Sequence, residues 1–405
     1  MHTTGEVQLL MPVLLLALLL VLVSVSETEG AHGDPDNVHA KKPTNHPFLI
    51  CTRDQFPALR ERAGREPWTA MKNNALRQVA RHYSPDDTRD AVPRLQRFIG
   101  ACALAYILEP EQRTQHAGRI HRAIVDHVAD VEFNEELKWI GVVPPMATAF
   151  VATIALDIAY DDLSKAQRKA CESVIVEQIG KIRRNGAWPL ARYGTHGTWD
   201  IYTGERTTPD DKFYRRYMEH VTEDGVVTTA TSYAWARLAS GDSRPQKTAY
   251  ADVLEFTGID RRYYDNARLR KFYRWLYGCS LTPARQVHAI GDFIPQDVRN
   301  SALAWRTGRF DSQAARYMAW ALKEHEPPGH VLAYILTHER HDPLVPGSRL
   351  YPDGGAFLRE PEDSADSLGA ALYNIRADAM WHAHEETNAI SLSAYGARLL
   401  MNGEI

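Results

Sequence analysis

The chain has few cysteines, and their spacing excludes one kind of site. The four are Cys51, Cys102, Cys171 and Cys279, far apart and without a Cys-x-x-Cys pair. Zinc sites made of thiolates use such close pairs, so we do not expect one here. In an exported chain the cysteines could pair in three ways, among which the sequence does not choose. Because Cys102 lies in an apolar run, a buried free thiol fits it equally well.

The sequence also lacks a strong net charge and, after its first thirty residues, a long uncharged apolar run. The formal net charge of −4 gives the whole chain no field that would attract nucleic acid. Basic residues gather locally at 181–192 and 261–274, either as solvated helix faces or as guides for an acidic polymer. With 405 residues, 44% of them hydrophobic, the chain can bury a large core.

The first residues predict export. Residues 9–25 are almost continuously apolar, and the small side chains of Ser24 and Ser26 suit signal-peptidase cleavage. We therefore expect a signal peptide at 1–26, a polar linker at 27–45, and a secreted or periplasmic protein without stable membrane insertion. No Lys or Arg precedes the apolar run, so an uncleaved membrane anchor stays an alternative.

The remaining sequence predicts a mainly α chain with a C-terminal β region. Helical apolar periodicity dominates residues 46–333, and residues 334–405 form a second domain with short β-prone pieces between prolines and glycines. The expected helices cover about 54–64, 68–82, 92–108, 113–131, 145–160, 164–185, 211–222 and several segments within 231–326. The expected strands cover 356–359, 370–376 and 390–394, with a hairpin at Gly396. These strands are too few for a closed sandwich, so the second domain is either truncated or leans on the helices.

Three clusters suggest chemistry. His382 and His384 would project to the same face of an extended strand, as a site would require and as solvated surface histidines could also do. His196 lies between two glycines, which permit an unusual loop path and a close approach to a ligand. Tyr233 follows an acidic-Gly turn at 223–225 and begins a helix that could present its hydroxyl to a cleft.

The order of these clusters resembles the heparinase II/III-like polysaccharide lyases and their alginate and oligoalginate lyase relatives. The quoted motifs are His-Gly-Thr-Trp at 196–199, Ser-Tyr at 232–233 and His-x-His at 382–384, together with the opening His-Pro-Phe-Leu-Ile at 46–50. The resemblance implies an incomplete (α/α) toroid followed by an antiparallel β-sandwich region. It also implies β-elimination on an anionic, uronate-containing polysaccharide of glycosaminoglycan, alginate or ulvan type.

The resemblance also implies roles for individual residues. Tyr233 matches the acid, and often the base, at the scissile bond, and His196 matches the histidine that holds the uronate carboxylate. His382 matches a partner base. We expect Thr195, Trp199 and Arg192, beside His196, to bind substrate, although family members commonly have asparagine in place of Thr195.

A structural zinc is the remaining implication. His384 matches a zinc ligand of some members, but Glu386 and Asn402 depart from the usual acidic ligands. Zinc needs about four ligands, and this set is incomplete, so no cofactor is expected to be required for the chemistry.

Two other functions stay open. A hydrolase built on a helical toroid would use paired carboxylates, such as Asp200 with Asp224. A catalytically inactive carbohydrate-binding protein of the same fold would keep the shape without Tyr233 chemistry.

Overall fold

The structure is a computed structural model, which describes the chain from residue 45 to residue 400 with several gaps. The described residues are 45–81, 83, 91–132, 143–185, 189–219, 221–227, 230–235, 247–290, 302–323, 325–374 and 389–400, with only the backbone at 91, 143, 183–185, 232–233 and 302–304. The predicted signal peptide and nearly all of the predicted linker lie outside these ranges. Among the helices of these ranges, none is long and apolar enough to cross a membrane.

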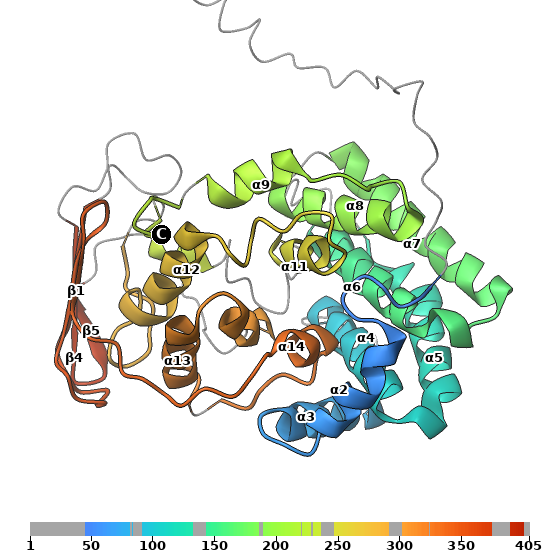
Figure 1. Cartoon of the computed structure of the whole chain (residues 1–405), viewed down its shortest axis with the longest axis horizontal. Coiled ribbons are helices and arrows are strands. Elements are labelled where there is room, and N and C mark those ends of the chain that lie inside the picture. The colour runs from blue at the N-terminus through green and yellow to red at the C-terminus, as the bar shows by residue number, and fades with distance from the viewer. Residues whose placement is uncertain are drawn as a thin grey trace, which may run out of the picture. The chain divides into compact units, whose positions relative to one another are not determined.

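Helices make up most of the described chain, as the periodicity predicts (Figure 1). The α-helices are α2 (Phe56–Arg62), α3 (Trp68–Ala80), α4 (Ala91–Leu108), α5 (Arg113–Arg122), α6 (Val143–Ala159), α7 (Lys165–Asn185), α8 (Pro189–Thr203), α9 (Asp211–Met218), α10 (Thr231–Ala234), α11 (Ala249–Phe256), α12 (Ala267–Arg274), α13 (Ser312–Ala321) and α14 (Val331–Leu336). Short 3₁₀ or π segments are η1 (Arg53–Gln55), η2 (Pro110–Gln112), η3 (Ala123–Val128), η4 (Tyr160–Asp162), η7 (Trp275–Cys279) and η9 (Ala302–Arg309).

Local capping fixes several helix starts. A capping box begins α7, since Ser164 and Gln167 exchange side-chain to backbone hydrogen bonds of 2.9 and 3.3 Å. Asp210 caps α9, Asn266 caps α12 and Asp311 caps α13, each accepting from backbone N–H groups of the first turn. These side chains satisfy amide groups that a helix start otherwise leaves unpaired.

The helices contact one another in a closed succession. Helix α4 packs on α6, α6 packs on α8, and α8 packs on α11. Arg306 of η9 then donates to the Thr248 carbonyl before α11 at 3.2 Å, and α14 packs on both η9 and α4. Tyr334 of α14 also donates to the Leu59 carbonyl of α2 at 2.6 Å. This closed ring of contacts agrees with the expected toroidal arrangement.

The cysteines lie inside this helical core. All four thiols are buried and unpaired, so none of the three disulfide pairings is formed. Cys102 is fully buried in α4 among apolar side chains, which confirms the free-thiol interpretation of that residue. Burial raises the pKa of the Cys102 thiol to about 12, so this group is an inert packing residue.

The expectation of a loop around His196 is wrong. Helix α8 runs through the whole motif, and neither Gly194 nor Gly197 has a positive φ. Gly197 serves a close approach, because a Cβ there would lie 2.1 Å from the Tyr250 hydroxyl of α11. The glycine is therefore needed for helix packing and not for an unusual backbone path. The helix expected at 211–222 also ends earlier, at Met218, because Val221 pairs with Val227 in a β-bridge.

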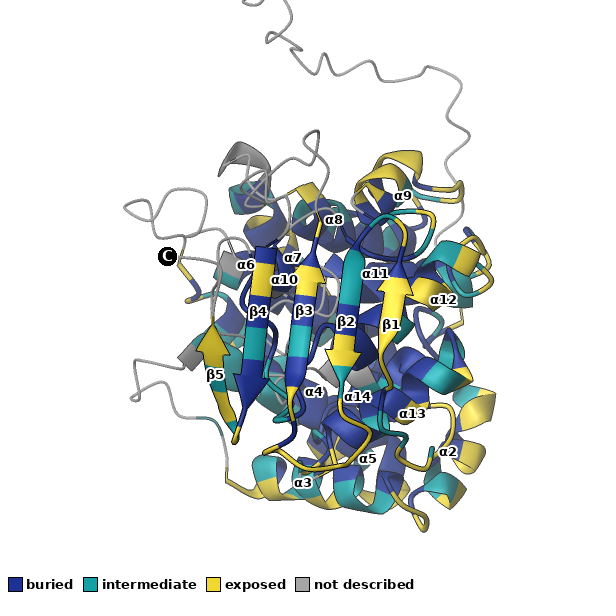
Figure 2. Cartoon of the chain, turned by 90° about the vertical axis from the view of Figure 1, so that its left-hand side faces the viewer, coloured by how far each residue is buried: buried dark blue, intermediate teal, exposed yellow. Residues whose placement is uncertain are grey.

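The C-terminal part is one five-stranded antiparallel sheet with its strands in chain order, which confirms the predicted β region (Figure 2). The strands are β1 (Arg349–Tyr351), β2 (Gly355–Arg359), β3 (Gly369–Tyr373), β4 (Ala389–Ala394) and β5 (Ala397–Leu400). The hairpin at Gly396 is confirmed: Tyr395 and Gly396 both take positive φ, as a tight two-residue turn requires. Strand β1 is not predicted, because three residues between prolines and glycines give no visible alternation.

The sheet has two different faces. Its inner face packs on the helical part through buried side chains such as Phe357, Ala371 and Tyr373. Its outer face exposes leucines, with Leu350 75% and Leu358 58% exposed (Figure 2). The contacts of the inner face are those expected of a β region that leans on the helices.

Candidate functional site

Helix α8 carries four of the predicted site residues on one face. Arg192, Thr195, His196 and Trp199 follow the spacing i, i+3, i+4 and i+7, which aligns side chains along a helix. Arg192 and His196 are half-buried, whereas Thr195 and Trp199 are buried. The face therefore has two partly accessible positively charged or titratable groups among packed neighbours.

The hydroxyl of Thr195 is used inside the protein. It donates to the Ala191 carbonyl at 3.0 Å and lies 3.1 Å from the Met146 carbonyl of α6, so its single hydrogen is shared between two backbone acceptors. The substrate-binding role of Thr195 stays a prediction. In this geometry the hydroxyl joins α8 to α6, and only its lone pairs remain for another partner.

Aromatic rings pack around the same helix. The Trp199 ring stacks on Tyr202 with centroids 5.2 Å apart, and only 8% of Trp199 is exposed. Tyr202 in turn donates to Glu172 of α7 at 2.9 Å. The Arg192 guanidinium lies 5.7 Å from the Tyr193 ring centroid, within the range of a cation–π contact. Trp199 thus helps to fix α8, and its predicted role in lining a cleft is untested.

An ion-paired cluster closes the C-terminal end of α8. Arg206 lies 3.7 Å from Asp200 and 3.4 Å from Asp210, and Tyr250 donates to Asp210 at 3.3 Å. Burial raises the pKa of Tyr250 well above its ordinary value; the charge of Arg206 opposes this effect and the carboxylates of Asp210 and Asp200 add to it, so this phenol stays protonated. These contacts hold α8 and α11 at the distance that the missing side chain of Gly197 permits.

Tyr233 lies on the short helix α10, which is anchored at its first residue. The Thr231 amide donates to the Ile290 carbonyl at 3.2 Å, and the Thr231 hydroxyl donates to the His288 carbonyl. At the other end, the Trp235 indole donates to the Ser280 hydroxyl at 2.9 Å. The backbone that carries Tyr233 is therefore fixed against the segment 280–290 at both ends.

Two tight turns join the helical part to the sheet, and we name them the first turn (Val221–Val227) and the second turn (Leu281–Val287). The first turn has Gly225 at φ +89°, and it is the acidic-Gly turn predicted from the sequence. Its Asp224 accepts from the Asp353 amide beside the sheet at 2.9 Å. The Tyr373 hydroxyl of β3 donates to the Val227 carbonyl at the end of the same turn.

The second turn is held by arginines of the sheet. Arg359 of β2 donates to the Leu281 carbonyl and Arg398 of β5 donates to the Val287 carbonyl, the latter at 3.0 Å. His288, directly after this turn, lies 3.1 Å from the Ser391 hydroxyl of β4 through its Nδ1. The first turn precedes α10 in the chain, and the second turn leads into His288, which contacts both α10 and β4.

His288 is a residue that the sequence analysis missed. It is 2% exposed, and burial together with the charges of Arg359 and Arg398 lowers its pKa to about 3. The ring is therefore neutral at physiological pH. The sequence gives little sign of this role, because a single histidine in an apolar run is usually a core residue. In the structure it is a core residue that connects Thr231 to β4.

His382 and His384 lie outside the described residues, in the chain between β3 and β4. Both flanking strand ends are described, and Tyr373 pairs with Ala389 across them. Since Tyr373 also donates to Val227, the chain leaves and re-enters the sheet next to the turn that leads into α10. In the described part of the chain, no group of three His, Cys, Asp or Glu side chains could hold a metal ion, and the predicted zinc ligand His384 is not among those residues.

Comparisons with known proteins give likeness only at the level of solved structures. No family model matches the chain, and no curated protein matches it. A heparinase III, the BT4657 gene product, is 12% identical with a TM-score of 0.41, over 81% of this chain and 56% of that one. The heparan sulfate lyase HepC from Pedobacter heparinus is 13% identical with a TM-score of 0.40, over 85% of this chain and 59% of that one. The chain thus spans less than two thirds of the length of either protein, and likeness at these values carries no argument about activity.

Proposed function

We propose that this protein is a secreted or periplasmic polysaccharide lyase that cleaves a uronate-containing polymer by β-elimination. In this proposal Tyr233 and His382 move protons at the scissile bond, and His196 with Arg192 binds the uronate carboxylate. The substrate class is an anionic polysaccharide such as a glycosaminoglycan, alginate or ulvan.

One observation supports this proposal above the others. The strand ends that flank the His382 segment contact the first turn through the Tyr373–Val227 hydrogen bond, and that turn leads within six residues to Tyr233. Thr231 and Trp235 fix the backbone on both sides of Tyr233. The described strand ends on either side of the His382 segment thus lie at the same junction as the chain that leads to Tyr233, which supports acid–base chemistry by a tyrosine and a histidine.

The reaction balances without added water or an oxidant. A base takes the C5 proton, the electron pair forms the C4=C5 double bond, and the C4–O bond breaks. The departing oxygen receives a proton from Tyr233, which acts as the acid. Cations or N–H donors near the carboxylate stabilise the charge that develops on it, and His196 and Arg192 are the half-buried candidates on α8.

The hydrolase alternative is weakened by the contacts of Asp224. One of its carboxylate oxygens accepts from Thr222, and the other accepts from the Asp353 amide. The Val226 amide also donates to this carboxylate, so Asp224 is a structural group that holds the turn and is already engaged on both oxygens.

The inactive carbohydrate-binding alternative has one observation in its favour. The hydrogen of the Thr195 hydroxyl is already shared between two backbone carbonyls, so one predicted carboxylate donor is engaged elsewhere. Binding without product, unchanged by Tyr233→Phe, would favour this alternative over the lyase.

The deciding experiment follows the ultraviolet absorbance of the unsaturated product with the full chain and heparan-type, alginate and ulvan polymers. Only elimination creates the conjugated double bond, whereas hydrolysis releases reducing ends without it. We expect Tyr233→Phe and His196→Ala to abolish the absorbance increase. Tyr395→Phe, at an 80% exposed hairpin residue, and His121→Ala on α5 are matched controls expected to keep it. Absence of the signal on all polymers, or equal rates in Tyr233→Phe and Tyr395→Phe, would refute the lyase proposal.

A further inference from the structure

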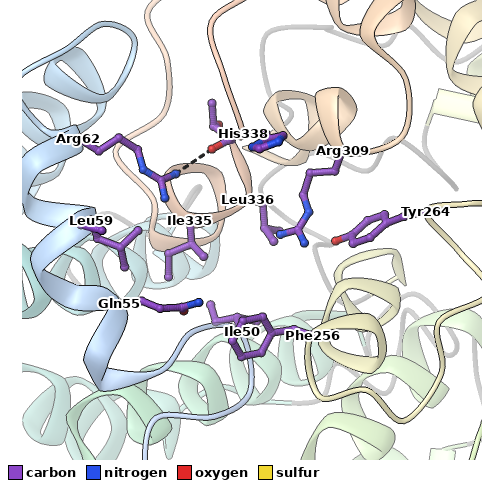
Figure 3. Close-up of a pocket in the computed structure, with 12 residues that line it drawn as sticks. Ile50, Gln55, Leu59, Arg62, Phe256, Tyr264, Arg309, Ile335, Leu336 and His338 are labelled. Carbon is purple, nitrogen blue, oxygen red and sulfur yellow. Dashed lines mark hydrogen bonds between the residues drawn. The ribbon is translucent and has the colours of Figure 1, made fainter.

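A pocket of about 480 Å³ lies between parts of the chain that are far apart in sequence. It is lined by residues before and within α2, the end of α11, Tyr264, the end of η9, and the end of α14 with the two residues that follow it (Figure 3). None of its lining residues belongs to the α8 face, to α10 or to the sheet. Its volume falls in the range of small-molecule sites.

The charges of this pocket are unbalanced. Arg62 and Arg309 line it, and no aspartate or glutamate does. Burial lowers the pKa of Arg62; the nearby Tyr334 opposes this effect, and the charges of Arg65 and Arg309 add to it. Among the described residues, neither arginine has a carboxylate within ion-pair distance, whereas the nearby Arg306 pairs with Asp252.

Both arginines are held in place without using up their donors. Arg62 donates to the Thr337 carbonyl at 2.9 Å, which leaves the other N–H groups of its fork. Arg309 lies 4.5 Å from the centroid of the Tyr264 ring, and it makes no hydrogen bond to any residue in the described ranges. The Tyr264 hydroxyl is itself fixed by Asp252 at 2.5 Å. The Arg309 fork is therefore oriented by a stationary ring and keeps its donors for a ligand.

The opposite wall of the pocket is mostly apolar, with the amide side chain of Gln55 among its residues (Figure 3). Leu59, Ile50, Phe256 and Ile335 line it below the two arginines (Figure 3). An anion with an apolar body or ring face would cover this wall while its head group meets the guanidinium forks. Planar carboxylates match such forks through two parallel hydrogen bonds.

We propose that this pocket binds a sugar-sized organic carboxylate, with Arg309 as its main head-group ligand and Arg62 as the second. The proposal stands on the pocket alone and does not require lyase chemistry. A uronic acid has the required size, one carboxylate and an apolar ring face, so D-glucuronate is the probe.

The test is calorimetric titration of the full chain with D-glucuronate, D-glucose and acetate. Glucose lacks the carboxylate and acetate lacks the ring, so we expect only glucuronate to bind measurably, and more weakly as salt rises. Arg309→Gln should weaken its binding by at least about tenfold, the effect of losing a charge-assisted hydrogen bond. Arg81→Gln, at an exposed arginine after α3, is the matched control and should leave binding unchanged.

Two further variants make the result decisive. His196→Ala should keep glucuronate binding, which separates this pocket from the proposed catalytic site, and loss of binding in that variant would overturn the proposal. Arg309→Lys keeps the charge but not the fork, so it should bind more weakly than the wild type even if Arg309→Gln fails to fold. Absence of glucuronate binding to the wild type, or equal binding by Arg309→Lys, would also overturn it.

Discussion

Replacing Gly197 with alanine sets helix propensity against packing at the centre of α8. In an unstrained helix the change would stabilise by about 0.5–1 kcal/mol, because glycine loses more backbone entropy. Here the new Cβ would lie 2.1 Å from the Tyr250 hydroxyl oxygen and 2.2 Å from its Cζ. Tyr250 is fully buried and bonded to Asp210, so its ring cannot move without disturbing that cluster. Overpacking of this kind costs about 1–3 kcal/mol, so we expect a net loss of about 1–2 kcal/mol.

The matched control is Gly118→Ala in α5, where a Cβ meets nothing within 4 Å. That variant should gain up to about 1 kcal/mol. Urea unfolding followed by circular dichroism measures both changes. Rates of the proposed elimination reaction add a second readout, because only Gly197→Ala should displace the helix that carries His196. If both variants shift the unfolding free energy in the same direction, the packing explanation for Gly197 is wrong.

Three other predictions concern stability and solubility. Arg306→Met removes the partner of the buried Asp252 and should lower the free energy of unfolding in urea by about 3–5 kcal/mol. Adding Asp252→Leu should recover part of this loss. If the effects of the two single substitutions simply added, the pairing would be contradicted. Burial lowers the pKa of His330 from 6.5 to about 4, so the unfolded chain binds a proton first and stability is lost as pH falls from 6.5 to 4. His330→Asn keeps an N-cap acceptor and should flatten this loss, which reaches about 1.4 kcal/mol for each pH unit; an unchanged slope would refute the assignment. Leu358→Thr on the outer sheet face should cost less than about 0.5 kcal/mol and reduce light scattering, and a large loss of stability would contradict its exposure.

The sequence predicted elements whose signals are local. Helices α4 and α7 follow apolar periodicity, and the capping box of α7 lies entirely within four residues. The prediction of a loop within α8 was wrong. Gly197 makes room for the ring of Tyr250, which lies more than fifty residues further along the chain. Apolar periodicity and capping residues depend on the local backbone, so the sequence reveals them. A glycine at a helix crossing depends on a distant neighbour, which is known only from the fold.

The same distinction applies to the candidate site. The spacing of His196 and Trp199 on one helix face could be derived once the helix was known, but the burial of Thr195 against Met146 could not. His288 has its partner on Ser391, 103 residues away, so no local pattern announces it. The residue types suggested the chemistry. Long-range packing determined which of the candidate polar groups already have hydrogen-bond partners inside the protein.

The closure of the helical ring has a consequence for how the protein is made. The Tyr334–Leu59 and Arg62–Thr337 hydrogen bonds each join residues 275 positions apart. The contacts of α2 with α14 therefore cannot form until most of the chain has been synthesised. The pocket lined by Arg62 and Arg309 includes residues of both regions, so it cannot be complete earlier. A small carboxylic acid bound there would interact only with the complete, folded chain. It would therefore stabilise the finished protein and none of the shorter nascent chains.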